Sequence, residues 1–111
     1  MELLITTYLS PEHRDASGRG CISAALLGEL SRQSSETRKC YTEGLLNLVR
    51  SMATALPNVV SDSESVILAI FSTLIGSLQL ARAVEGGELS DRILAAGIDA
   101  AQAILKLYQN K

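Results

Sequence analysis

The sequence contains few of the residues on which catalytic and metal sites usually depend. It has two cysteines, one histidine and no tryptophan. Cys21 and Cys40 form no Cys-x-x-Cys pair and His13 is the only imidazole, so a structural zinc site within one chain would lack ligands. A phosphate-binding loop is also missing, because Gly18-Arg19-Gly20 has neither the length nor the following lysine of a P-loop. We therefore expect no catalytic residue, no metal and no cofactor.

Only Cys21 and His13 offer a pair for nucleophilic chemistry, which keeps a small helical enzyme as a third functional hypothesis. No orienting acid or oxyanion hole is recognisable beside them. The simpler expectation is that Cys21 is a buried small hydrophobic residue and His13 a solvated surface residue. A helix that starts beside Cys21 would favour its thiolate, so redox sensing is a further hypothesis for thiol titration to test.

The chain also lacks a cluster of cationic charge. Ten Lys and Arg residues oppose twelve Asp and Glu residues and are scattered along the sequence, so nucleic-acid binding by this chain alone is disfavoured. No basic segment followed by an apolar core opens the sequence, which argues against a secretory signal. The apolar run from Val66 is interrupted at Ser72-Thr73, Ser77 and Gln79, short of the roughly 20 apolar residues of a membrane span. We expect a cytoplasmic protein that does not enter a membrane.

Apolar residues make up 47% of the chain, and their spacing predicts an all-α fold. Residues 2–8 resemble the end of a helix, and Ser10-Pro11 predicts one further turn over 12–14. Main helices are predicted over 22–33 and over 36–56, where Pro57 marks the stop. A capping box, Ser61-Asp62-Ser63-Glu64, predicts the start of the third, which ends at Gly86-Gly87; Ser90-Asp91 is predicted to cap the fourth. The short connection implies an antiparallel hairpin in one domain, residues 1–111, with about four main helices.

The third and fourth main helices carry more apolar surface than one small core can absorb. A domain of this size buries only about 65% of the surface that its unfolded chain exposes, so a second copy of the chain is the expected cover. Small residues on both helices would allow another helix to approach closely. We therefore predict a symmetric homodimer built from the third and fourth main helices. The predicted interface residues are Ala69, Thr73, Gly76, Leu80, Ile93, Gly97, Ala100 and Ile104.

A ligand pocket is predicted between the second and third main helices. Helical spacing allows apolar side chains of the two helices to face one another, with Tyr41 or Thr73 as the polar group. The alternative is a filled core, which is the usual fate of an apolar stripe. The predicted ligand-contacting residues are Tyr41, Leu45, Leu48, Met52, Ile67, Phe71 and Leu74.

Several segments resemble the C-terminal domain of tetracycline-repressor-type (TetR/AcrR) transcriptional regulators. The first part of that domain is similar to residues 8–11 (YLSP), His13-Arg14, residues 20–26 (GCISAAL) and Glu29-Leu30. The final two helices of the family are similar to residues 76–84 (GSLQLARAV) and 89–94 (LSDRIL). The resemblance covers nearly the whole chain and rests on order and spacing, since none of these motifs is catalytic.

The resemblance implies an effector-binding and dimerisation domain. Such regulators pair through their last two helices into an intermolecular four-helix bundle, hold a small effector between the earlier helices and signal to an N-terminal helix-turn-helix that binds DNA. No recognition helix with basic flanks is present here, so DNA binding would require a helix-turn-helix that this chain lacks. The alternative function is a small helical interaction module that dimerises without a ligand.

Overall fold

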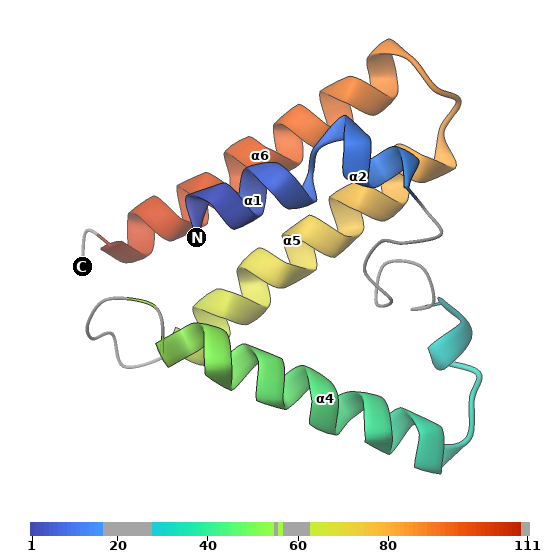
Figure 1. The fold of residues 1–111 in the computed structure, drawn as a ribbon, viewed down its shortest axis with the longest axis vertical. Helices are drawn as coiled ribbons and strands as arrows, with labels where there is room; N and C mark the ends of the chain where they lie inside the picture. Colours follow the sequence, from blue (N-terminus) through green and yellow to red (C-terminus); the bar gives the residue numbers. More distant parts are fainter. Residues whose placement is uncertain (17–27, 55, 57–62, 110–111) are drawn as a thin grey trace.

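The computed structural model describes residues 1–16, 28–54, 56 and 63–109, and every regular element in these ranges is a helix. The elements are α1 (Glu2–Tyr8), α2 (Pro11–Asp15), α4 (Ser35–Thr54), α5 (Ser63–Ala83) and α6 (Glu88–Gln109). The predicted all-α class is confirmed. Figure 1 shows α5 and α6 as a long antiparallel pair, with α1 lying along α6 and α4 diverging from α5.

The connection between α5 and α6 differs from its sequence-based prediction. α5 ends at Ala83 rather than at the glycine pair, and α6 begins at Glu88, two residues before the predicted cap. Gly87 has a φ of 115°, a backbone conformation that favours glycine, and its carbonyl accepts the first helical hydrogen bond from the Asp91 N–H at 3.1 Å. Gly87 therefore takes the N-cap position, and Ser90 lies inside the first turn of α6.

The short helices α1 and α2 form as the sequence predicts. Ser10 caps α2, because its Oγ accepts a hydrogen bond from the His13 N–H at 3.2 Å and Pro11 occupies the first helical position. Ile5 and Leu9, on and just after α1, are buried against the long pair. α1 therefore covers one face of the α5–α6 hairpin and leaves the other faces open to packing by other elements.

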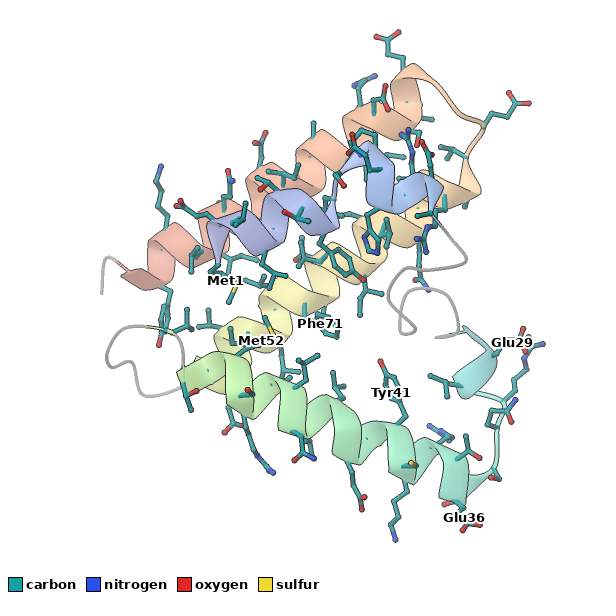
Figure 2. The ribbon with its side chains drawn as sticks, viewed as in Figure 1. Met1, Glu29, Glu36, Tyr41, Met52 and Phe71 are labelled. Atoms are coloured by element: carbon teal, nitrogen blue, oxygen red, sulfur yellow. The ribbon has the colours of Figure 1, made fainter. Side chains whose placement is uncertain are left out.

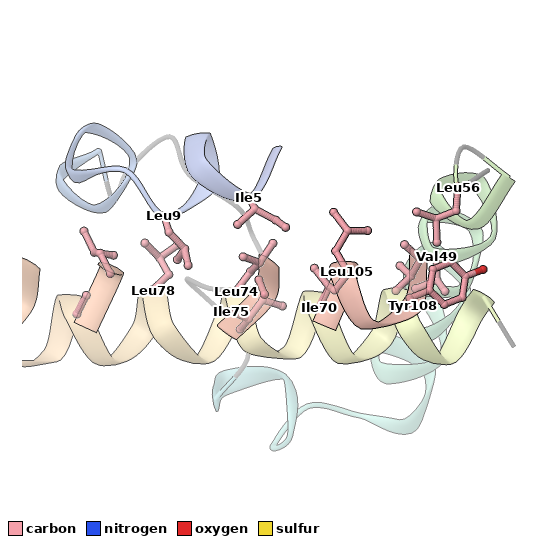
Figure 3. Close-up of a cluster of buried hydrophobic side chains, with 14 residues drawn as sticks. Ile5, Leu9, Val49, Leu56, Ile70, Leu74, Ile75, Leu78, Leu105 and Tyr108 are labelled. Carbon is pink, nitrogen blue, oxygen red and sulfur yellow. The ribbon is translucent and has the colours of Figure 1, made fainter. Parts of the chain in front are cut away.

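One hydrophobic cluster joins α1, α4, α5 and α6 (Figure 3). On α6, Leu94, Ala101 and Leu105 are buried in this cluster, whereas Ile93, Ile98 and Ile104 are only partly buried against it. Tyr108, at the C-terminal end of α6, lies beside Val49 of α4 in Figure 3. The buried apolar members are Ile5, Leu9, Val49, Leu56, Ile67, Ile70, Leu74, Ile75, Leu78, Ala81, Leu94, Ala101, Leu105 and Tyr108.

The second main helix was predicted over 36–56 and is observed as α4, Ser35–Thr54. Its contact with the core is centred on Val49, which the sequence analysis did not single out. Leu48, which was placed on the inner face, is 45% exposed because it lies one position around the helix from Val49. Only the C-terminal half of α4 is therefore anchored in the core.

Some predicted features fall outside the described residues. These are Cys21, the start of the helix predicted over 22–33, the Ser61 end of the predicted capping box and the stop at Pro57. Residues 28–30 are helical and are followed by turn and bend residues at 31–33, so this helix ends three residues before its predicted end at Gln33.

A hydrogen-bonded ring, which we call the three-helix ring, links α2, α5 and α6 at the hairpin end. Arg14 of α2 donates from Nη1 to Ser90 Oγ at 3.0 Å and to Asp91 Oδ1 at 2.7 Å. Ser90 in turn donates from Oγ to the Ala81 carbonyl of α5 at 2.7 Å. Hydrogen bonds to Asp15, which has the larger effect, and to Asp91 raise the pKa of Arg14, so its guanidinium stays charged.

Arg82 of α5 closes the three-helix ring. It donates from Nε to the Arg14 carbonyl at 3.1 Å and from Nη2 to the His13 carbonyl at 3.0 Å. These carbonyls lie in the last turn of α2, where the His13 carbonyl also accepts from the Ala16 N–H at 3.2 Å, so Arg82 acts as a C-terminal cap supplied by another helix. The ring fixes α2 against both long helices.

Replacing Ser90 tests the contribution of the three-helix ring. Ser90 is 1% exposed, so we expect Ser90→Ala to lower the free energy of unfolding by about 1 kcal/mol through loss of its hydrogen bonds. Urea unfolding at fixed protein concentration, followed by circular dichroism, measures the change. Ser51→Ala, at an exposed position of α4, is the matched control and should not destabilise the protein. Equal stability of the two variants would show that the hydrogen bonds of Ser90 do not contribute to stability.

α5 needs a correction with respect to membranes. The uninterrupted apolar run from Val66 is too short for a membrane span, but over its whole length α5 is long and apolar enough to cross a membrane. Core helices of soluble proteins pass the same test. Here one side of α5 is packed in the hydrophobic cluster, with Ile67, Ile70, Leu74 and Leu78 all buried.

Candidate dimer face and ligand pocket

The predicted dimer residues gather in one groove between α5 and α6. The groove has a volume of about 420 Å³. Six of the predicted interface residues line it, three from each helix, together with Ser72, Ser77 and Ala96. The six are Thr73, Gly76, Leu80, Ile93, Gly97 and Ala100. The remaining two continue the same faces, since Ala69 is exposed four residues before Thr73 and Ile104 is half-buried four residues after Ala100.

The face around this groove, which we call the α5–α6 face, exposes large apolar side chains without charge. Leu80, Leu89 and Leu107 are 55%, 54% and 70% exposed. α5 carries no Asp, Glu, Lys or Arg between Glu64 and Arg82. A face that is apolar, depleted in charge and open to solvent has the composition of the core of a protein–protein interface.

The charged residues of α6 lie on a different side of the helix from its exposed apolar residues. Arg92, Asp99 and Lys106 are exposed and recur every seven residues, so they lie above one another on one side. The apolar residues Ile93, Ala100 and Leu107 have the same spacing and lie on the neighbouring side. α6 therefore has a buried side, an exposed apolar side and a charged side.

The two glycines of the α5–α6 face have different surroundings. A Cβ atom at Gly97 would collide with the Ser77 side chain and with Leu9 Cδ1, so Gly97 allows α6 to approach α5 and α1 closely within one chain. A Cβ at Gly76 would meet nothing within 4 Å. Tight packing inside the chain thus explains Gly97 but not Gly76.

A second depression, which we call the α4–α5 pocket, lies where α4 diverges from α5. Its volume is about 260 Å³. In Figure 2 the Tyr41 side chain extends from α4 toward α5, and Phe71 extends from α5 toward α4. The lining residues are Tyr41, Leu45, Leu68, Phe71, Ser72, Ile75, Gly76 and Gln79. They include no Asp, Glu, Lys or Arg, and the Tyr41, Ser72 and Gln79 side chains offer polar groups.

The α4–α5 pocket brings together three of the seven predicted ligand-contacting residues, namely Tyr41, Leu45 and Phe71. Ile67 and Leu74 instead lie in the hydrophobic cluster on another side of α5. Met52 packs against that cluster, and Leu48 does not line the pocket.

The pocket residues of α5 that were missed are Leu68, Ser72, Ile75, Gly76 and Gln79. α5 is apolar nearly all round, so its periodicity did not indicate which residues turn toward α4. Residues 68, 72, 76 and 79 lie along one side of α5 and line the pocket. Only the slightly more polar composition of this side distinguishes it in the sequence.

Of the two residues considered for nucleophilic chemistry, only His13 lies among the described residues. His13 is half-buried rather than solvated: its ring meets the Tyr8 ring edge-on, and Nδ1 donates to the Tyr8 carbonyl at 2.6 Å. Cys40 is exposed on α4. Within the part of the chain that the structure describes, no group of three His, Cys, Asp or Glu side chains is placed to hold a metal ion.

Comparison with known families and curated proteins does not identify a family for this chain. Neither the models of known protein families nor the curated proteins give a match to the chain.

Proposed function

We propose that this chain is the homodimerising, effector-sensing domain of a TetR-like transcriptional regulator. The observation that carries the proposal is the uncharged α5–α6 face, on which large apolar side chains stay exposed in the single chain. Burial of apolar surface is the dominant favourable term in association, and a two-fold pairing would bury each contact twice. An obligate interface of this kind buries about 2,000 Å² or more in total.

A second copy of the chain is the partner that we propose for this face. The charges of α6 border the apolar side rather than interrupt it, so two copies can bring the faces together while Arg92, Asp99 and Lys106 stay in water. Pairing of two hairpins gives a four-helix bundle made from α5 and α6 of each chain.

The effector part of the proposal rests on the α4–α5 pocket. Its walls are mainly aliphatic and aromatic, and its polar groups are uncharged. This chemistry suits a small, largely apolar molecule with one or two hydrogen-bonding groups. DNA binding is not proposed for these residues, because the ten Lys and Arg residues are scattered along the sequence; it would require a separate helix-turn-helix.

Sedimentation equilibrium without detergent, at micromolar concentration, tests the dimer; we expect twice the chain mass. A folded monomer, or a protein that remains soluble only with detergent or lipid, would contradict the proposal. A thermal-shift panel of small apolar alcohols, acids and aromatic compounds tests effector sensing, since a ligand at one hundred times its Kd stabilises by about 2.7 kcal/mol. A dimer that responds to none of them would favour the interaction module without a ligand.

A further inference from the structure

The three-helix ring borders a cavity whose walls carry two guanidinium groups. Arg14 of α2 and Arg82 of α5 both line this cavity, which has a volume of about 340 Å³. α2 lies across the C-terminal end of α5, near the turn into α6 (Figure 1), so the two arginines meet at one end of the hairpin. We propose that this cavity, which we call the ring cavity, binds a small monocarboxylate on Arg82.

Arg82 is a half-buried cation that is bonded to main-chain oxygens only. Its two hydrogen bonds go to the His13 and Arg14 carbonyls. In the part of the chain that the structure describes, the arginines that pair with a carboxylate are Arg14 and Arg32. Arg82 thus has its positive charge away from bulk water without a carboxylate beside it, and a bound anion would neutralise that charge.

The undescribed residues offer no acidic side chain for this position. Residues 17–27, which follow α2 in the sequence, contain no Asp or Glu. Asp62 is the one acidic residue outside the described ranges, and it is next in sequence to Ser63, about 28 Å along α5 from Arg82. The counter-charge of Arg82 is therefore expected to come from a ligand.

The guanidinium of Arg82 keeps a pair of donors suited to a carboxylate. A guanidinium has five N–H donors in one plane, and the two carbonyl bonds use Nε and one hydrogen of Nη2. Nη1 and the second hydrogen of Nη2 match the spacing of two carboxylate oxygens. Arg14 differs, because its Nε and Nη1 are already bonded to side-chain oxygens of Asp15, Ser90 and Asp91. Arg82 is thus the residue that would hold the ligand.

The other walls of the ring cavity favour one class of anion. Asp15 also lines it, so a second negative charge on the ligand would be repelled, and a monocarboxylate is preferred to a phosphate dianion. Gly86, next to the N-cap of α6, lines it too, so the positive end of that helix dipole adds to the attraction. Ala81 and Val84 offer apolar contact for a short hydrocarbon chain. Butyrate has this chemistry.

The ring cavity shares no lining residue with the α4–α5 pocket or with the groove of the α5–α6 face. Its occupancy therefore does not depend on a dimer or on an effector beside α4. A carboxylate bound to Arg82 would act where α2 already joins the long hairpin. Binding to the folded chain would stabilise that junction.

Butyrate titration followed by proton–nitrogen correlation NMR tests the site. We expect saturable shifts of the Gly86 and Ser90 amide signals, whereas Gly44, exposed on α4, should not respond. Phosphate and chloride at the same ionic strength are the comparison anions and should bind more weakly. A response to either of them as strong as the response to butyrate overturns the assignment to a monocarboxylate.

Two variants at Val84 locate the ligand. Val84→Glu adds a carboxylate to the cavity wall without removing a hydrogen bond of the ring, and Val84→Gln is its neutral match. We expect the glutamate variant to bind butyrate about tenfold more weakly or worse, and the glutamine variant to bind like the original protein.

Arg82→Gln should lose the saturable shifts, because it removes both the charge and the paired donors. If its spectrum shows that α2 is no longer folded, the Val84 pair decides. Equal affinity of Val84→Glu and Val84→Gln, or no saturable shift in the original protein, overturns the ring-cavity site. A monomer that binds butyrate contradicts the proposed dimer and leaves this site standing.

Discussion

The Ala100→Glu variant should lose the dimer. Ala100 is an exposed residue of the groove on the α5–α6 face, and pairing would bury a new carboxylate there without a partner. Leaving an unpaired charge in a buried site costs about 3 to 5 kcal/mol, so the dissociation constant should rise by at least about a hundredfold. Sedimentation velocity across a concentration series measures the shift.

Ala95→Glu is the matched control for this change. It makes the same substitution on the same helix, and Ala95 is exposed but does not line the groove. We expect the control to dimerise like the original protein. If both variants dimerise normally, the α5–α6 face is not the interface; if both dissociate, added negative charge rather than its position is responsible.

Gly97→Ala should destabilise each folded chain. The added Cβ would overlap the Ser77 side chain and come within 3.0 Å of Leu9 Cδ1, which forces the α5–α6 crossing apart. Such overpacking costs about 1 to 3 kcal/mol, against a gain of up to about 1 kcal/mol from the higher helix propensity of alanine. Urea unfolding at fixed protein concentration should therefore show a net loss of stability. Ser77→Gly should restore part of it in the double variant.

The Gly76→Ala variant should have the opposite effect on the stability of the folded chain from Gly97→Ala. Its Cβ meets nothing within one chain, so alanine should stabilise the helix by about 0.5 to 1 kcal/mol. The same Cβ would stand in the proposed interface, where it should weaken the dimer. A variant with unchanged dimer affinity would show that Gly76 does not contact a partner chain.

Local signals in the sequence predicted most of the helices. Serine and proline placed the start of α2, and the end of α4 came within two residues because Pro57 cannot continue a helix. The start of α6 was misplaced because Ser90-Asp91 has the composition of a cap, whereas Gly87 takes that position through a positive φ. Sequence alone does not distinguish a serine that caps a helix from one that bonds to a neighbouring helix.

The candidate site was predictable only where one side of a helix differs from the rest. α6 alternates charged and apolar sides, so spacing alone predicted which of its residues line the groove, namely Ile93, Gly97 and Ala100. α5 is apolar nearly all round, so Ile67 and Leu74 were assigned to a pocket although they belong to the core. The three-helix ring was missed because Arg14 meets Asp91 across most of the chain, and no local pattern records such a contact.

Because α4 is anchored in the core through one half only, it should fold and unfold at a different stage from the α5–α6 hairpin. α5 and α6 are adjacent in sequence, so their pairing closes a short loop at low entropic cost and can form early in folding. α4 holds to that hairpin through its C-terminal half, around Val49, while its N-terminal half diverges from α5 (Figure 1). Elements with few buried contacts open at lower free energy than the global transition, so amide hydrogens of α4 should exchange before those of α5 and α6. The helix that borders the pocket is thus the one that thermal fluctuation releases first.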